Sequence, residues 1–317
     1  MEALECNKKY LFTTEIPKNE NLSFDGFLLN NQGHLSLQPC QNKISFFLVQ
    51  KHDSVIVARC TFFIENNHAQ SPYRSSFGSI EMDEKVRFDV IDEFWKKIEN
   101  TLKNKGVKMI TIKSYPFCYH LKNSSLLSFL FSYNGFSLQT QELNYHIPVK
   151  ESLFEKIIHE NERKKLKKAQ RMGYVFEIAK NPDLKKAYEF IKKNRDKKNY
   201  PVTLEFSDFK KTIEAFPEHY QLFTVSLKKQ WAAIAVTIKI NKTILYTFYA
   251  ADDYSFRIDS PVVFLHHGIY NYCIEKKIKL IDLGIGSLKG CPNLPLIAFK
   301  EKIGGKSSLK LIFSKSL

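Results

Sequence analysis

Apolar residues recur at helical spacing in five segments of the second half of the chain. Ser152 and Glu155 form a capping box at the start of the first segment, and Gly173 is a natural end for that helix. Pro261 stands at the first position of another helix, where its missing N–H is not needed. These patterns predict helices at about 152–173 and 294–303, and helices that begin near 181, 207 and 261.

Short apolar segments between these helices indicate strands. The polar links 228–230 and 241–243 join three of the strands and favour antiparallel hairpins. Segment 279–283 is nearly all apolar, so we expect it at the centre of a sheet. The predicted strands span 174–178, 220–227, 231–240, 244–250, 279–283 and 309–313. After the first helix, the predicted element order is therefore β-α-α-β-β-β-α-β-α-β.

The first half of the chain repeats part of this order, as β-β-β-α-β-α-β. Segment 105–112 (KGVKMITI) occupies the place of 277–283 (KIKLIDL), and 127–136 occupies the place of 296–305. Two diverged copies of one α/β unit explain this order, and a generic alternation of helices and strands is the alternative. The strands and helices predicted here span 44–50, 55–64, 77–81, 86–102, 107–112, 121–133 and 142–149.

Charge distinguishes the two halves. The net charge is +15, and residues 151–317 hold 31 Lys and Arg against 18 Asp and Glu. The first 150 residues hold the remaining 17 against 15. A basic second half suggests an anionic partner such as CoA, a nucleotide-linked precursor, tRNA or a membrane surface. A soluble protein that is simply rich in lysine is the alternative.

Composition excludes several classes of protein. A length of 317 residues suggests two domains, and 44% apolar residues are enough for a buried core. No apolar run approaches the roughly 18 residues of a membrane span, and the first residues lack a signal-peptide pattern. We therefore expect a cytoplasmic protein, which could contact the inner face of the membrane. The scattered cysteines, and His266-His267 without a carboxylate at i+4 spacing, predict neither disulfides nor a metal site.

Three short motifs, together with the element order, resemble the FemAB-like branch of the GNAT acyltransferases. Residues 163–169 (RKKLKKA) with Gly173 resemble the basic helix of that branch. Residues 298–304 (AFKEKIG) resemble its C-terminal F-K-x-x-[aromatic/aliphatic]-G motif, and 134–136 (NGF) with 143–145 (LNY) resemble its domain junction. The likeness covers most of residues 44–313.

This resemblance implies an α/β (α+β) fold with two tandem GNAT-like units. Each unit would be a mixed, mostly antiparallel sheet flanked by helices. Residues 1–150 would form a diverged unit on the acceptor side, and residues 151–317 would form the unit on the donor side.

The resemblance also places the acyl group of the donor in a gap beside the strand 244–250. Backbone N–H groups polarise the acyl carbonyl in such enzymes, so few side chains are needed. Tyr246, Phe248 or Tyr249 would line the gap, with Tyr249 as a catalytic candidate. Asp282 on the next strand is a candidate general base. Ordinary strand packing of the tyrosines and a backbone hydrogen bond to Asp282 are the alternatives.

The phosphate-binding loop of the family, [QR]-x-x-G-x-[GA], corresponds to residues 257–262 (RIDSPV). Only Arg257 fits, because Ser260 replaces a glycine, Pro261 removes an N–H donor and Asp259 adds negative charge. Arg257 and Ser260, together with Tyr246 and Phe248, are the candidate cofactor-binding residues. The altered loop favours aminoacyl-tRNA as the donor. The small size and the lack of a coiled-coil arm favour acyl-CoA, which we place first.

Lys300 is the leading catalytic candidate. On the family pattern it would face the gap and stabilise negative charge that develops on the donor, as a fixed cation can. A solvent-facing lysine on an amphipathic helix is the alternative.

Four further residues are candidate substrate contacts. Arg163 and Lys167 belong to the stretch 163–171, which has six basic residues in nine and could bind phosphates. Tyr73 and Arg74 lie in a polar, aromatic segment, 71–78, that resembles the acceptor-facing segment of the FemAB-like branch. A solvated helix face and a plain loop turn are the respective alternatives.

The sequence thus predicts an acyltransferase that acts on an amine or hydroxyl of a small or cell-envelope precursor. Its donor would be acyl-CoA. A FemAB-type aminoacyl-tRNA-dependent peptidoglycan aminoacyltransferase is one alternative. A catalytically inactive GNAT-fold protein that binds a partner through its basic half is another.

Overall fold

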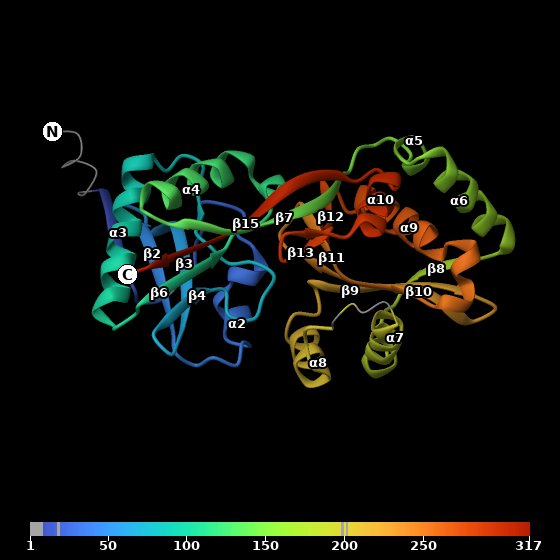
Figure 1. The fold of residues 1–317 in the computed structure, drawn as a ribbon, viewed down its shortest axis with the longest axis horizontal. Coiled ribbons are helices and arrows are strands. Elements are labelled where there is room, and N and C mark those ends of the chain that lie inside the picture. The colour runs from blue at the N-terminus through green and yellow to red at the C-terminus, as the bar shows by residue number, and fades with distance from the viewer. Residues whose placement is uncertain (1–8, 18–19, 198–199, 201) are drawn as a thin grey trace. The chain divides into compact units, whose positions relative to one another are not determined.

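The computed structural model describes residues 9–17, 20–197, 200 and 202–317 (Figure 1). The chain divides into two compact units. Unit 1 comprises residues 1–142 and 308–317, and unit 2 comprises residues 143–307. The division after residue 142 lies close to the predicted boundary at residue 150, and the last ten residues join unit 1 rather than unit 2.

The sheet of unit 1 has the strand order β1-β2-β3-β4-β6-β15, with β5 paired to β3. The pair β4–β6 is parallel and the other pairs are antiparallel. The strands are β1 (Tyr10–Thr13), β2 (Lys43–Gln50), β3 (Val55–Glu65), β4 (His68–Ser71), β5 (Glu81–Met82), β6 (Met109–Lys113) and β15 (Lys306–Ser316). The helices are η1 (Leu28–Asn30), α2 (Gln32–Leu35), α3 (Phe88–Asn104), η2 (Phe117–Tyr119) and α4 (Leu121–Tyr133).

The sheet of unit 2 repeats this arrangement in the order β8-β9-β10-β11-β12-β7, with β11–β12 as its parallel pair. Its strands are β7 (Ser137–Pro148), β8 (Val175–Ile178), β9 (Tyr220–Leu227), β10 (Gln230–Lys239), β11 (Ile244–Asp252) and β12 (Leu280–Ile285), and β13 (Ser287–Leu288) with β14 (Cys291–Pro292) forms a separate hairpin. Its helices are α5 (Phe154–Ile157), α6 (Glu160–Met172), α7 (Leu184–Asp196), α8 (Phe206–Ala215), η3 (Tyr254–Asp259), α9 (Pro261–Glu275) and α10 (Leu294–Lys302).

The sixth strand of each unit is exchanged. Strand β7 follows α4 of unit 1, yet its residues 144–148 pair with β12 in unit 2. Strand β15 follows α10 of unit 2, yet its residues 312–316 pair with β6 in unit 1. Each sheet is therefore completed by a strand that follows a helix of the other unit.

Helices cover both faces of the unit 2 sheet. Helix α9 buries Leu265 and Ile269 against Phe223 and Ala235 of the sheet, and α6 adds Leu166 to the same cluster. Helices α7 and α8 lie on the opposite face (Figure 1). The sheet of unit 2 is thus covered on both faces, and α6 and α9 pack on the face with the buried cluster.

Unit 1 uses aromatic residues for the same purpose. Trp95 of α3 is fully buried, and its ring packs edge-on against Phe131 and Phe136 at 5.7 and 5.2 Å between centroids. Offset and edge-to-face contacts of this kind add to the burial of apolar area.

Most predicted elements are confirmed, and the errors have local causes. The predicted strand at 77–81 is wrong, because Ser79 has a left-handed φ of 80° and the third strand is β4. The predicted capping box is also wrong. Ile158 is extended and separates α5 from α6, and His159 caps α6 through Asn161 N. Helix α8 begins at Phe206, within one residue of its predicted start.

Gly268 in α9 allows the helix to approach β8. A Cβ at this position would lie 2.2 Å from a ring carbon of Phe176. We expect Gly268→Ala to lower the free energy of unfolding by about 1–3 kcal/mol, since overpacking outweighs the better helix propensity of alanine. Urea unfolding measures this change. Asn271→Ala, on an exposed position of α9, is the control and should stay within about 0.5 kcal/mol of the parent chain. Equal stability of the two variants would contradict the packing argument.

Candidate functional site

The two parallel strands of unit 2 diverge after a short paired stretch. Strands β11 and β12 pair at three levels, and the last is Tyr246 opposite Asp282. Strand β11 continues beyond this level to Asp252, and β12 continues to Ile285. The backbones of the two strands therefore part at Tyr246 and Asp282, as two sides of a V.

Both strands carry an extra residue where they part. The register of β10 with β11 shifts so that Val236 faces Tyr249 while Thr237 faces Thr247, which leaves Phe248 as the extra residue. On β12, the register with β7 skips Leu283. A bulge takes backbone N–H and C=O groups out of the ladder and turns them to new directions. The opening of the V can thus present backbone donors to a carbonyl group between the strands.

Lys300 holds the end of β12. Its Nζ donates to the carbonyl oxygens of Gly284 and Ile285 at 2.9 and 2.7 Å, and its side chain is buried. Burial lowers the pKa of Lys300 to about 7, and the nearby Arg195 lowers it too, although Asp282 opposes this shift. A neutral amine keeps two N–H groups, which is the number that these two bonds need. Lys300 can therefore exchange a proton near neutral pH without losing its position.

Three of the predicted residues meet at Gly284. Lys300 binds its carbonyl oxygen, and Asp282 Oδ1 accepts from its N–H at 2.7 Å. The ring of Tyr246 lies 3.6 Å from the place of a Cβ at Gly284, whose φ is 74°. A Cβ would meet the ring only at ordinary contact distance, so the left-handed φ rather than lack of space favours glycine here.

Asp282 is buried and acts on the backbone in this structure. Besides the Gly284 N–H, its Oδ1 accepts from Asn144 Nδ2 of β7 at 2.9 Å. These bonds fix the bulge of β12 against β7. Its role as a general base stays a prediction.

Tyr249 lies apart from this cluster. Its buried hydroxyl accepts from the N–H groups of Thr203 and Leu204 at 3.0 and 3.2 Å, so it fastens the segment ahead of α8. The guanidinium of Arg195 packs over the Tyr249 ring, 5.3 Å from its centroid. Phe248 is half-buried beside both neighbours, 4.1 Å from the Tyr249 centroid and 6.0 Å from that of Tyr246.

Sequence reasoning did not predict Arg195 near Lys300, and it considered His266 only as a metal ligand. Arg195 of α7 is half-buried and close enough to Lys300 to lower its pKa. His266 of α9 is buried beside Phe299, and burial with the charge of Lys300 lowers the pKa of His266 to about 4. No sequence pattern relates either residue to Lys300, because only the packing of α7 and α9 brings them to it.

The start of α9 differs from a helix N-terminus that binds anions through free backbone N–H groups. Pro261 has no N–H, and the Val263 N–H donates to Ser260 O at 3.0 Å. Ser260 has a left-handed φ of 51°, and its N–H donates to Arg257 O. The predicted phosphate-binding donors of this loop are thus directed at the chain itself.

Asp259 occupies the same end of α9, and a cation compensates its charge. Its carboxylate pairs with Lys168 Nζ at 2.7 Å and accepts from the Tyr174 hydroxyl at 2.9 Å. These bonds lower the pKa of Asp259, and burial opposes them. The arrangement ties α6 to the start of α9.

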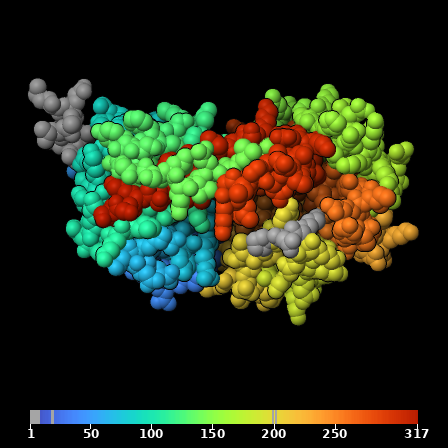
Figure 2. Space-filling view, in the orientation of Figure 1, coloured from blue at the N-terminus to red at the C-terminus, as the bar shows by residue number. Residues whose placement is uncertain are grey.

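The basic helix α6 lies at the surface of unit 2 (Figure 2). Its Lys164 and Lys165 pair with Glu160 and Glu162 at 2.7 and 2.9 Å. Arg163 and Lys167 are exposed and one helical turn apart. Part of the predicted positive charge is therefore neutralised within the helix, and Arg163 and Lys167 stay candidates for a polyanion.

In unit 1, Tyr73 and Arg74 lie together on a surface segment after β4. The Arg74 guanidinium is 5.5 Å from the Tyr73 ring centroid, and the Tyr73 hydroxyl donates to Glu65 at 3.3 Å. The Arg74 N–H donates to Gln38 Oε1 at 2.7 Å. Contact of these residues with an acceptor stays a prediction.

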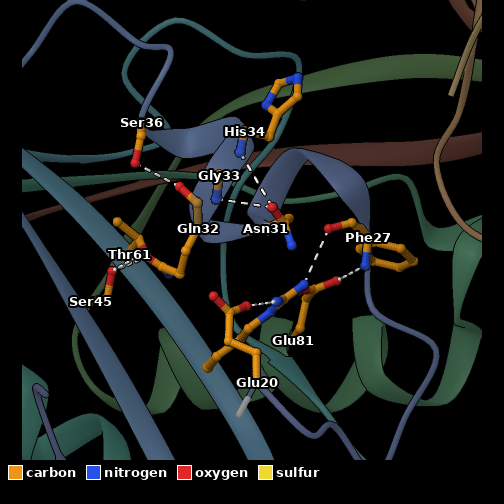
Figure 3. Close-up of polar contacts among 11 residues, drawn as sticks. Glu20, Phe27, Asn31, Gln32, Gly33, His34, Ser36, Ser45, Thr61 and Glu81 are labelled. Carbon is orange, nitrogen blue, oxygen red and sulfur yellow. Dashed lines mark hydrogen bonds and ion pairs between the residues drawn. The ribbon is translucent and has the colours of Figure 1, made fainter. Parts of the chain in front are cut away.

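A buried ion pair in unit 1 was not predicted from the sequence. Arg59 of β3 binds Glu81 of β5 at 2.7 Å, and Glu20 contacts the same guanidinium at 3.5 Å. Glu81 also accepts from the Phe27 N–H, which joins the turn before η1 to the sheet (Figure 3). Burial raises the pKa of Glu81, and Arg59 opposes this shift.

Two classes of site are not found among the described residues. None of the helices in that part of the chain is long and apolar enough to cross a membrane. Within the same residues, no cluster of three or more His, Cys, Asp or Glu side chains could hold a metal ion.

Replacing Lys300 should change how stability depends on pH. The folded pKa of about 7 lies below the ordinary 10.5, so the unfolded chain binds more protons between these values. Stability therefore rises with pH in this window, by at most about 1.4 kcal/mol per pH unit. Lys300→Met should lack this rise. Urea unfolding from about pH 6 to pH 9 measures it, with exposed Lys302→Met as the control. A parallel pH dependence of Lys300→Met and the parent chain would disprove the shifted pKa.

Sequence and structure comparisons agree on one family of folds. Residues 159–290 match the model of the acetyltransferase (GNAT) domain, and a search of curated proteins finds no match. The structure of FemX has a TM-score of 0.71 at 14% identity, over 92% of this chain and 93% of that one.

Two further structures share the fold at lower similarity. The C-terminal domain of a putative lysylphosphatidylglycerol synthetase from Agrobacterium fabrum has a TM-score of 0.57 at 14% identity, over 91% of this chain and 88% of that one. The structure of L-PGS from Bacillus licheniformis has a TM-score of 0.55 at 12% identity, over 88% of this chain and 85% of that one. The chain therefore has the fold of tandem GNAT-like units, and its residues 159–290 match the GNAT acetyltransferase domain family.

Proposed function

We propose that this protein transfers an acyl or aminoacyl group from an activated donor to an amine or hydroxyl. The observation that carries the proposal is the V between β11 and β12, with bulges at Phe248 and Leu283 on its two sides. Such an opening can hold a flat acyl carbonyl between two backbones and offer it N–H donors. The match of residues 159–290 to the GNAT domain supports the same chemistry.

The chemical step needs few side chains. The acceptor nitrogen or oxygen attacks the acyl carbon, the new bond forms, and the carbonyl oxygen becomes negative. The bond from the acyl carbon to the leaving oxygen or sulfur then breaks, and the proton of the acceptor passes to the leaving group or to solvent. Lys300, with a pKa of about 7, is suited to stabilise the negative oxygen when charged or to relay the proton when neutral.

We propose aminoacyl-tRNA as the donor in preference to acyl-CoA. The support is the start of α9, which is poorly suited to bind a pyrophosphate. Pro261 has no N–H, the Val263 N–H is already hydrogen-bonded, and Asp259 carries negative charge. The exposed Arg163 and Lys167 of α6 offer two cations to a longer phosphate backbone. The acceptor that the sequence suggested, a small or envelope precursor, rests on the resemblance to FemAB-like proteins.

An inactive binding protein is the second candidate function. All three predicted catalytic side chains favour it, because Lys300, Asp282 and Tyr249 are buried and hydrogen-bonded within unit 2. The V itself favours catalysis, since packing alone does not require two bulges at one level.

Transfer assays separate these candidates. The chain would be incubated with labelled aminoacyl-tRNA or acyl-CoA and a panel of amines, and product would be counted. We expect transfer from aminoacyl-tRNA and a loss of about 10²–10³-fold in kcat for Lys300→Met, the effect of removing one charge-stabilising group. Lys302→Met, its exposed neighbour on α10, should keep the parent rate.

Two outcomes would count against the proposal. Transfer from acyl-CoA alone would reverse the order of donors. No transfer from either donor, together with tRNA binding that is unchanged in Lys300→Met, would favour the inactive binding protein.

A further inference from the structure

The LNY motif of β7 lies beside the carbonyl groups that Lys300 binds. In the register of β7 with β12, Tyr145 is opposite Gly284 and Asn144 is opposite Ile285. Gly284 and Ile285 are the residues whose carbonyl oxygens accept from the Lys300 amine. The motif therefore runs next to both acceptors of that amine.

The same motif fixes the chain on either side of these carbonyl groups. Asn144 Nδ2 donates to Asp282 ahead of them. Beyond them, the Gly286 N–H donates to Leu143 O at 2.6 Å, and the Leu143 N–H donates to Ser287 Oγ at 2.8 Å. The segment that carries the two carbonyl groups is therefore held against β7 at both ends.

Tyr145 also contacts α10, the helix that carries Lys300. Its side chain is buried, and its hydroxyl donates to Glu301 Oε1 at 2.9 Å. A Cβ at Gly286 would lie 3.0 Å from the Tyr145 ring and 2.9 Å from Ile297 of α10. Tyr145 thus packs close to the residue that follows the second carbonyl group and binds the residue that follows Lys300.

The Tyr145 hydroxyl stays a donor over the pH range in which Lys300 titrates. Burial raises the pKa of Tyr145 to about 12, and the hydrogen bond with Glu301 adds to this shift. The pKa of Lys300 is about 7, so its amine gains or loses a proton while the tyrosine stays neutral. A change of pH near neutrality therefore leaves this contact between β7 and α10 in place.

We propose that Tyr145 is a positioning residue, which holds α10 where the Lys300 amine reaches the carbonyl groups at the end of β12. The inference deepens the proposed acyl transfer and rests on it, because an amine fixed at the end of β12 is also fixed relative to the V. A charge that is already in place needs no rearrangement during the reaction. Tyr145 acts through Lys300 and not on the acyl group.

Titration of the Lys300 amine tests the proposal without an assay of transfer. Lysine with an NMR-active carbon at Cε is incorporated into the full chain, and the Lys300 signal is the one that Lys300→Met lacks. Tyr145→Phe keeps the ring and removes only the hydroxyl. Because burial is the main cause of the low pKa, and an amine that is held less firmly is better hydrated, we expect the Lys300 midpoint to rise by at least about half a pH unit. A midpoint that does not rise would overturn the proposal.

Variants of Glu301 and of a second tyrosine separate positioning from a general loss of stability. Glu301→Gln removes the charge but keeps an oxygen acceptor, so it should keep the parent midpoint, whereas Glu301→Leu should raise it. Glu301 is exposed, so this pair decides the question where Tyr145→Phe does not fold. Tyr174→Phe removes a tyrosine–carboxylate bond of the same length, 2.9 Å, at the start of α9 and should leave the midpoint unchanged. An equal rise in Tyr174→Phe would show a general loosening of unit 2 and overturn the assignment.

The transfer assay separates this proposal from the proposed function. In a chain that transfers, Tyr145→Phe should lower kcat about tenfold and leave the acceptor KM unchanged, since a small misplacement of one reacting group slows the chemical step. A raised Lys300 midpoint in Tyr145→Phe, in a chain that transfers from no donor, supports the positioning and defeats the function. Transfer at the parent kcat in Tyr145→Phe, with an unchanged midpoint, supports the function and defeats the positioning.

Discussion

The placement of β12 between a parallel and an antiparallel neighbour is the constraint on which unit 2 depends. On one side it pairs with β11 only as far as Asp282, and on the other it follows β7. Past that level, Asp282 binds Asn144 and Gly284, and Lys300 binds the last two carbonyls. These polar contacts hold the strand where ladder bonds to β11 have ended, so the opening is a stable feature of the fold.

Unit 1 shows what the same topology gives without this constraint. Its parallel pair, β4 and β6, is in register at four levels, and β4 ends at Ser71, where the pairing ends. No part of β4 extends past its partner. The buried charges of unit 1, Arg59 and Glu81, instead join β3, β5 and the turn at Phe27. In unit 2 the parallel strands therefore separate into a V. In unit 1 they stay paired to the end of β4, and the buried charges form an ion pair instead.

The sequence predicted regular elements well and site geometry poorly. Period-two and period-3.6 patterns located β9, α4 and the start of α9 at Pro261, because burial imposes those periods. The motif resemblance identified Lys300 but could not predict which groups its side chain binds. The carbonyls that accept from it belong to β12 and not to its own helix. Bulges leave no periodic signal. The exchange of β7 and β15 could not be predicted from the sequence either, because the pattern of either strand would allow it to complete either sheet.

That exchange has a consequence for synthesis of the chain on the ribosome. Strand β6 ends at Lys113, and the strand that covers its free edge begins at Lys306. At about 5–20 residues per second, roughly 10–40 s pass between their translation. During that interval the nascent first unit exposes an unpaired apolar strand, which is a template for wrong pairing. Chaperone binding to this edge, or a transient pairing with β7, would protect the nascent chain until β15 emerges.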